Sequence, residues 1–249
     1  CSSDLAEITA HAPADGYTLG LVNASHAINV SLFSRAGYDL LKDFAPICLL
    51  VSSPYGITVH PSLGARTIGE LVALAKTKPG ALAYGSSANG TFLGGALLFE
   101  MTGIRLNYIA YKGGAPTLVA LLSGEIAVSL TSLSASLPHH RNGKLRVLAV
   151  STAKRSASAP DIPAAAESGV AGYEAASWYG LAAPAGTPQA IVTRLHGESV
   201  KVLQWPETRE KFLAAGIDPL GSSPAELGAY MRSEVEKWAR VIKATGIKL

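Results

Sequence analysis

Residues 84–91 read Tyr84-Gly85-Ser86-Ser87-Ala88-Asn89-Gly90-Thr91 and join a strand-like run to a helix-like run. A similar junction follows further along the chain, Tyr111-Lys112-Gly113-Gly114-Ala115-Pro116-Thr117. The first N–H groups of a helix have no partner within the helix, and the positive end of the helix dipole favours an anion. Two such junctions in tandem predict a binding cleft for a carboxylated or phosphorylated ligand.

Outward from these junctions, strand-like and helix-like segments alternate, which predicts an α/β fold with mainly parallel sheets. The strands are expected at 17–22, 44–51, 55–60, 82–84, 107–111, 125–130 and 145–151. Three of them in succession end in small or hydroxylated residues, the third in Thr131 and Ser132. Ligands in open α/β sheets collect at the C-terminal ends of strands. The repetition therefore predicts a binding edge.

The helix starts carry recognisable caps. Thr67-Ile68-Gly69-Glu70 is a capping box, and Ser223-Pro224-Ala225-Glu226 opens the last helix. Thr187 is expected to cap another helix, with Pro188 in its first turn. Three- and four-residue spacing predicts that the last helix buries Leu227, Tyr230, Met231, Trp238, Val241 and Ile242.

Composition excludes several classes of protein. With 249 residues, 48% of them hydrophobic and 16% charged, the chain can bury a core in one large or two smaller domains. A net charge of +3 without a long basic run does not indicate nucleic-acid binding. The His139-His140 doublet projects its imidazoles in different directions, so no shared metal is expected. No apolar run is long enough for a transmembrane helix.

Motifs for catalysis are also missing. The Gly-x-Ser-x-Gly elbow, the Walker phosphate loop and Gly-x-Gly-x-x-Gly do not occur. Recognition by helix dipoles and hydroxyl groups, with no cofactor and no metal, therefore outranks catalysis. A serine-dependent transferase or hydrolase that uses Ser86 or Ser87 remains the alternative from another class.

The sequence resembles the Bug-type solute receptors of tripartite tricarboxylate transporters from about Ala10 to the C-terminus. Seven segments follow that family's pattern in order: Ala14-Asp15-Gly16-Tyr17-Thr18-Leu19, Ser25-His26-Ala27-Ile28-Asn29, Lys42-Asp43-Phe44-Ala45-Pro46, Tyr84-Gly85-Ser86, Tyr111-Lys112-Gly113, Gly143-Lys144-Leu145-Arg146-Val147-Leu148-Ala149-Val150 and Trp178-Tyr179-Gly180-Leu181-Ala182-Ala183-Pro184-Ala185-Gly186-Thr187-Pro188.

The resemblance implies a type II periplasmic-binding-protein fold, in which two α/β domains close on a ligand between them. Domain one would comprise 1–57 and 177–249, and domain two 58–176. The ligand would be a small organic anion: a di- or tricarboxylate, an amino acid or an aromatic acid. The membrane subunits of the transporter would be the partners, and the protein would be periplasmic. The residues implied in ligand binding are Ser25, His26, Ser86, Ser87, Asn89, Gly90, Thr91, Gly113, Gly114, Thr131 and Ser132, with a purely structural role for His26 as the alternative.

The chain departs from the family at its start. Members usually begin with a strand, a loop and a helix that do not precede Cys1 here, so we expect an incomplete domain one and a possible dimer through it, or weakened binding. A sensory or remnant receptor without a transport role is a further alternative. A chain that opens Cys-Ser-Ser resembles a lipid-anchored lipoprotein, but the family pattern places Cys1 internally, which argues against lipidation.

Overall fold

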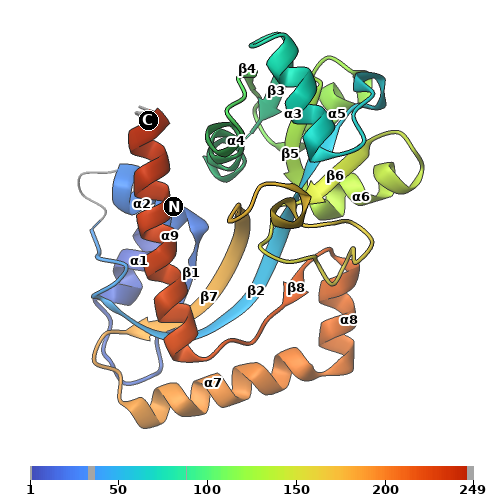
Figure 1. The fold of residues 1–249 in the computed structure, drawn as a ribbon. Helices are drawn as coiled ribbons and strands as arrows, with labels where there is room; N and C mark the ends of the chain where they lie inside the picture. The colour runs from blue at the N-terminus through green and yellow to red at the C-terminus, as the bar shows by residue number, and fades with distance from the viewer. Residues whose placement is uncertain (1, 33–36, 88, 246–249) are drawn as a thin grey trace. The chain divides into compact units, whose positions relative to one another are not determined.

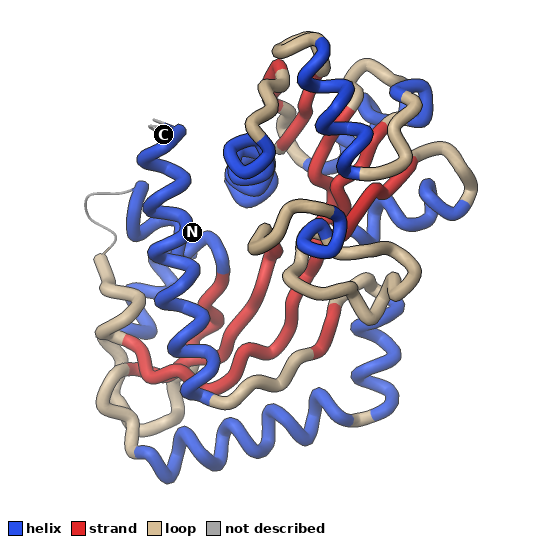
Figure 2. Tube along the Cα trace, in the orientation of Figure 1, coloured by secondary structure: helices blue, strands red, loops and turns tan. Residues whose placement is uncertain are grey.

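The computed structural model describes residues 2–32, 37–87 and 89–245, in which strands and helices alternate (Figure 2). The chain forms two compact units. Unit 1 comprises Cys1–Ser52, Ser177–Leu213 and Pro219–Leu249, and unit 2 comprises Ser53–Ala176 and Ala214–Asp218. Cys1, and with it the question of lipidation, lies outside the described residues. Within those residues no helix is long and apolar enough to cross a membrane.

Unit 1 is built on a small sheet (Figure 1). Strand β1 (Gly20–Asn23) pairs antiparallel with β7 (Ala176–Pro184), which lies between β1 and β2 (Phe44–Val59). Helix α1 (Ser2–Ala10) packs along β1, and α2 (Ala24–Leu32) packs against the long C-terminal helix α9 (Pro224–Thr245). The other helices of this unit are α7 (Gln189–Gln204) and α8 (Pro206–Ala214).

Helix α9 buries the stripe that its spacing predicts. Leu227, Met231, Trp238 and Val241 are buried, whereas Tyr230 and Ile242 are half-buried. The helix start predicted at Ser223 is confirmed, and it forms a capping box: the Ser223 hydroxyl accepts from the Glu226 N–H, and the Glu226 carboxylate accepts from the Ser223 N–H at 2.7 Å.

One buried member of α9 was not predicted. The Glu234 carboxylate is almost fully buried, and its Oε2 accepts from the indole N–H groups of Trp178 at 2.8 Å and Trp238 at 2.9 Å. Its Oε1 contacts the Lys237 ammonium. This carboxylate joins β7 to α9 inside unit 1.

Unit 2 contains a mixed sheet in the order β6-β2-β5-β3-β4. Strands β3 (Ala83–Ser86), β4 (Asn107–Ala110) and β5 (Val128–Ser132) run parallel, while β2 is antiparallel to β5 and to β6 (Arg146–Val150). The sheet is therefore less uniformly parallel than predicted. The helical elements of this unit are η1 (Pro61–Leu63), α3 (Ile68–Thr77), α4 (Asn89–Thr102), α5 (Gly114–Ser123), α6 (Leu133–Arg141) and η2 (Ala165–Ser168), and a short strand β8 (Asp218–Pro219) follows at its end.

Three expectations about local structure were wrong. The segments 44–51 and 55–60 form one strand, β2, because Pro54 precedes the paired residues Tyr55–Val59 and its missing N–H removes no bond to β5 or β6. The strand expected at 125–130 covers Val128–Ser132. Thr187 does not cap α7, because its hydroxyl donates to the Pro184 carbonyl at 2.8 Å and the helix begins at Gln189 without a side-chain cap.

Candidate functional site

The C-terminal ends of β3, β4 and β5 lie at one edge of the unit 2 sheet. Strand β3 pairs in parallel with both neighbours, so that Ser86 is opposite Ala110 and Gly85 is opposite Ser129. A helix follows each strand after a short connection or none: α4 after β3, α5 after β4 and α6 after β5. Parallel pairing thus brings three helix N-termini to the same edge, where ligands of open α/β sheets bind.

The first junction is partly internal to the fold. Ser86 is the last residue of β3 and is buried, and its hydroxyl donates to the Tyr108 hydroxyl at 3.3 Å. Thr91 is also buried, and its carbonyl accepts from the Tyr84 hydroxyl. In contrast, Ser87 is half-buried and Asn89 is exposed at the first turn of α4. The groups that face outward here are therefore those of Ser87 and Asn89.

The second junction leaves a helix start open. Gly113 precedes α5 with φ 116° and ψ 164°, a conformation that a side chain would strain, and no side chain caps this helix. Thr117 is turned inward, since its hydroxyl donates to the Gly113 carbonyl at 2.9 Å. Gly114 is exposed, and a Cβ atom at this residue would have no atom within 4 Å. A ligand can therefore approach the first N–H groups of α5 directly.

The third strand end combines a bonded threonine with an uncapped helix. The Thr131 hydroxyl is buried and lies 2.8 Å from the Thr58 hydroxyl of β2. Ser132 stands at the N-cap of α6, but its hydroxyl contacts the Ser134 hydroxyl at 2.8 Å and forms no capping bond. Two helices of this edge, α5 and α6, thus begin without side-chain caps, and the strands that precede them lie on either side of β3.

Three aromatic residues that sequence reasoning missed border this edge. Tyr55 is opposite Ser132 in the β2–β5 register, and a Cβ atom on Gly90 would lie 2.8 Å from its hydroxyl oxygen. The Tyr108 ring packs 4.5 Å from the Phe92 ring, centroid to centroid, with 43% of the Tyr108 residue exposed. Tyr108 could have been found from the sequence, because it lies in the expected strand that ends directly before the second junction.

Ser25 and His26 belong to unit 1, at the end of β1. Asn23 caps α2: its Oδ1 accepts from the N–H groups of Ser25 at 3.0 Å and His26 at 3.4 Å. The buried His26 ring accepts from the Asn23 N–H through Nδ1 at 3.0 Å, so this histidine does bond its own loop. The Ser25 side chain is exposed.

His26 and Asn23 also line a cavity of about 520 Å³ within unit 1, between α1 and the residues 18–23. Its wall is mostly apolar, with Leu5, Leu21 and Tyr179 among its members. The arrangement can accept a ligand, but the cap by Asn23 means that the first N–H groups of α2 are already bonded.

The eleven residues expected in the site carry no carboxylate and no fixed positive charge. The structure brings nine of them together at the strand ends of unit 2, and the other two lie in unit 1. Burial raises the pKa of Tyr84 well above its usual value, so the phenol that bonds Thr91 stays neutral. Within the described residues no group of three or more His, Cys, Asp or Glu is placed to hold a metal ion.

The sequence pattern of the tripartite tricarboxylate transporter family receptor matches residues 5–247. The chain belongs to this family. It is 34% identical to the protein BugT of Bordetella pertussis over 249 residues, which cover 98% of this chain and 76% of BugT. A protein encoded in the gbd 5′ region of Cupriavidus necator is 32% identical over 235 residues, or 94% of this chain and 71% of that protein.

Solved structures agree with this assignment. The structure of Rpa4515 from R. palustris with adipate has 35% identity and a TM-score of 0.78, covering 99% of this chain and 83% of that one. MatC from Rhodopseudomonas palustris with bound malate has 26% identity and a TM-score of 0.73, covering 96% and 84%. This receptor therefore has an α/β periplasmic-binding-protein fold.

The family resemblance is thus confirmed. Its members are non-catalytic solute-binding receptors, so the serine-dependent transferase or hydrolase is not supported as a function of Ser86 or Ser87. Other similar structures are described as a periplasmic transporter and the periplasmic binding protein BugD.

Proposed function

We propose that this protein is a periplasmic receptor that binds a small carboxylate and delivers it to the membrane subunits of a tripartite tricarboxylate-type transporter. The observation that carries the proposal is that α5 and α6 both begin without side-chain caps at one edge of the sheet, at the ends of parallel strands. Backbone N–H groups at helix starts bind carboxylates through charge-assisted hydrogen bonds. Relatives solved with adipate and malate support a ligand of this class.

In this proposal the ligand contacts are those of the predicted set. The start of α4 would contribute Ser87, Asn89 and the backbone of Gly90. The start of α5 would contribute Gly113 and Gly114, and the start of α6 would contribute Ser132. The buried residues Ser86, Thr91 and Thr131 would hold these groups in place. Ser25 and His26 would complete the site from unit 1.

We propose that the two units act as the two domains of a type II binding protein, which close on the ligand. We infer the domain bounds to be 1–57 with 177–249, and 58–176. A ligand drives domain closure only to the extent that it binds the closed state more tightly, and the membrane subunits would recognise that closed state.

A dimer through domain one is part of the same proposal. Among the described strands β1 pairs only with β7, and Leu5, Ile8 and Leu21 near its other edge are more than half exposed. A second copy that adds its own β1 would cover them. Native mass spectrometry tests this, and a monomer that keeps full ligand affinity would refute the dimer.

The substitution Gly114→Asp tests the carboxylate site sharply. Because Gly114 has open space around its Cβ position, an aspartate fits, and its negative charge at the start of α5 stabilises the helix by about 0.3–1 kcal/mol. The same carboxylate occupies the position proposed for the ligand and repels it. We expect unchanged or raised thermal stability together with loss of binding of adipate or malate in isothermal titration calorimetry.

The matched control is Gly114→Asn, which has the same shape without the charge and should keep most of the affinity. If Gly114→Asp binds the dicarboxylate as tightly as the unmodified protein, the proposed site is wrong. If no member of a panel of di- and tricarboxylates, amino acids and aromatic acids raises the melting temperature, the sensory or remnant receptor is the better description.

A further inference from the structure

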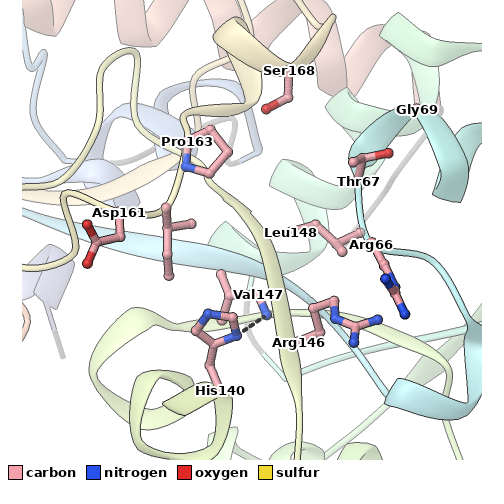
Figure 3. A pocket seen from close by; sticks show the side chains of 11 residues that line it. Arg66, Thr67, Gly69, His140, Arg146, Val147, Leu148, Asp161, Pro163 and Ser168 are labelled. Atoms are coloured by element: carbon pink, nitrogen blue, oxygen red, sulfur yellow. Dashed lines mark hydrogen bonds between the residues drawn. The ribbon is translucent and has the colours of Figure 1, made fainter. Parts of the chain in front are cut away.

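Unit 2 contains a cavity of about 630 Å³, whose lining side chains are shown in Figure 3. Among its lining residues is Arg146, the first residue of β6. Val59 pairs with both Arg146 and Val128, so Arg146 is level with the start of β5, whereas the proposed carboxylate site lies where β5 ends at Ser132. The two sites therefore share no residue and face different edges.

Two arginines without acidic partners stand on one wall of this cavity. The Arg146 guanidinium donates through Nη1 to the Ala65 carbonyl at 3.1 Å. Because Ala65 directly precedes Arg66, this bond keeps the Arg146 guanidinium close to Arg66. In the part of the chain that the structure describes, neither guanidinium forms an ion pair, although Arg155 in the same unit pairs with Glu167. In Figure 3 the two guanidinium groups lie on the same side, and Asp161 lies on the other. Two neighbouring cations without a counter-ion repel each other, and an anion between them removes that repulsion.

The His140 ring lies on the same cavity wall. Its Nδ1 accepts from the Val147 N–H at 3.3 Å, and the ring also hydrogen-bonds the Leu145 backbone. Burial and the positive charges of Arg146 and Arg141 lower the pKa of His140, which keeps the ring neutral at pH 7.

The start of α3 forms another part of the wall through Thr67 and Gly69. The Thr67 hydroxyl already accepts from the Glu70 N–H at 3.1 Å, and the Glu70 carboxylate accepts from the Arg66 N–H at 2.6 Å. Gly69 is exposed, and only the Thr67 hydroxyl comes within 4 Å of its Cβ position. The backbone at Gly69 is therefore accessible to a ligand.

We propose that this cavity is a second ligand site, which binds the phosphate group of a small metabolite between Arg66 and Arg146. Guanidinium forks match the oxygens of a phosphate, and donors here come from two arginines and the start of α3, which suits a group with three terminal oxygens better than a planar carboxylate. The cavity exceeds the size of a phosphate ion, and Asp161 on the far wall accepts hydrogen bonds from hydroxyl or amino groups of the remaining part of the ligand.

Titration calorimetry with inorganic phosphate and with glycerol 3-phosphate tests this site. We expect Arg66→Gln and Arg146→Gln each to weaken binding about tenfold or more, the effect of losing one strong charge-assisted contact. Arg141→Gln is the matched control, because it removes the same charge on the same unit outside the cavity wall. Arg66 has an exposed side chain, so its variant should fold even if Arg146→Gln, which also loses the bond to Ala65, does not.

Two further readouts separate this site from the carboxylate site. Gly114→Asp should keep phosphate binding, and phosphate should raise the pKa of His140 as measured by NMR, because the anion offsets the positive charges beside the ring. The proposal is overturned if phosphate and glycerol 3-phosphate show no saturable binding, if Arg66→Gln binds them as well as the unmodified protein, or if Arg141→Gln weakens binding equally.

Discussion

Removal of the Glu234 carboxylate should destabilise unit 1 more than any single surface change. In Glu234→Ala the indole N–H groups of Trp178 and Trp238 lose their common acceptor, and both rings are buried. Each buried donor without a partner costs about 1–3 kcal/mol. The Lys237 side chain, which is 16% exposed, can reach water and adds little. We expect a loss of about 3–5 kcal/mol in the free energy of unfolding, as for other broken buried pairs.

Urea unfolding followed by tryptophan fluorescence measures this loss. The three tryptophans, Trp178, Trp205 and Trp238, all lie in unit 1, so the signal reports that unit alone. Glu234→Gln retains an oxygen for the indoles but turns an amide NH₂ toward Lys237, and should cost about 1–2 kcal/mol. Glu236→Ala on the exposed face of the same helix is the control and should stay within about 0.5 kcal/mol. A Glu234→Ala protein whose stability equals that of the control would refute the reasoning.

Three other predictions follow from single residues. Gly85→Ala would place its Cβ 2.4 Å from Ile126 and should lower stability by about 1–3 kcal/mol in thermal unfolding, whereas Gly197→Ala, in open space within α7, should raise it by about 0.5–1 kcal/mol. Burial raises the pKa of Cys48 to about 11, so in a Cys1→Ser background Ellman's reagent should react with it only after urea is added, and fast reaction of the native protein would contradict this. Burial also raises the pKa of Tyr84 and Tyr173, so as the pH rises these phenols lose their protons in the unfolded state before they do so in the folded state. The free energy of unfolding should therefore fall as the pH rises above 10. Thermal unfolding between pH 9 and 11 should show a smaller decrease in the melting temperature for Tyr84→Phe than for the unmodified protein.

Much of the fold could be predicted from local sequence. The cap predicted at Thr67 is confirmed by the bond from the Glu70 N–H to the Thr67 hydroxyl, because such caps depend on residues three positions apart. The other half of the predicted box differs, since the Glu70 carboxylate accepts from the N–H of Arg66 and not from that of Thr67. The break expected between residues 51 and 55 does not occur, because Pro54 lies outside the part of β2 that pairs with β5 and β6. The bounds of β5 moved for a similar reason: Thr131 and Ser132 belong to the strand because they pair with Gly56 and Tyr55, far away in sequence.

The sequence predicts the sheet edge that carries the candidate site, but not which of its groups are exposed. Hydroxyl- and glycine-rich junctions after strands identified the edge. Sequence could not distinguish Ser86, whose hydroxyl is bonded to Tyr108, from Ser87 next to it, because burial is set by packing across the sheet. Tyr55 was missed because its strand lies well before the junctions and reaches them only by pairing with β5.

The residues at the strand ends of unit 2 fall into two sets, those whose side chains are bonded within the unit and those that are partly or fully exposed at helix starts. Ser86, Ser129 and Thr131 are bonded within the unit, so their replacement affects folding as well as binding. Ser87, Asn89 and Gly114 are at least partly exposed at helix starts, where substitutions leave the core intact. Single substitutions at these three positions can therefore change the ligand preference without disturbing the core, so that one fold can bind different ligands.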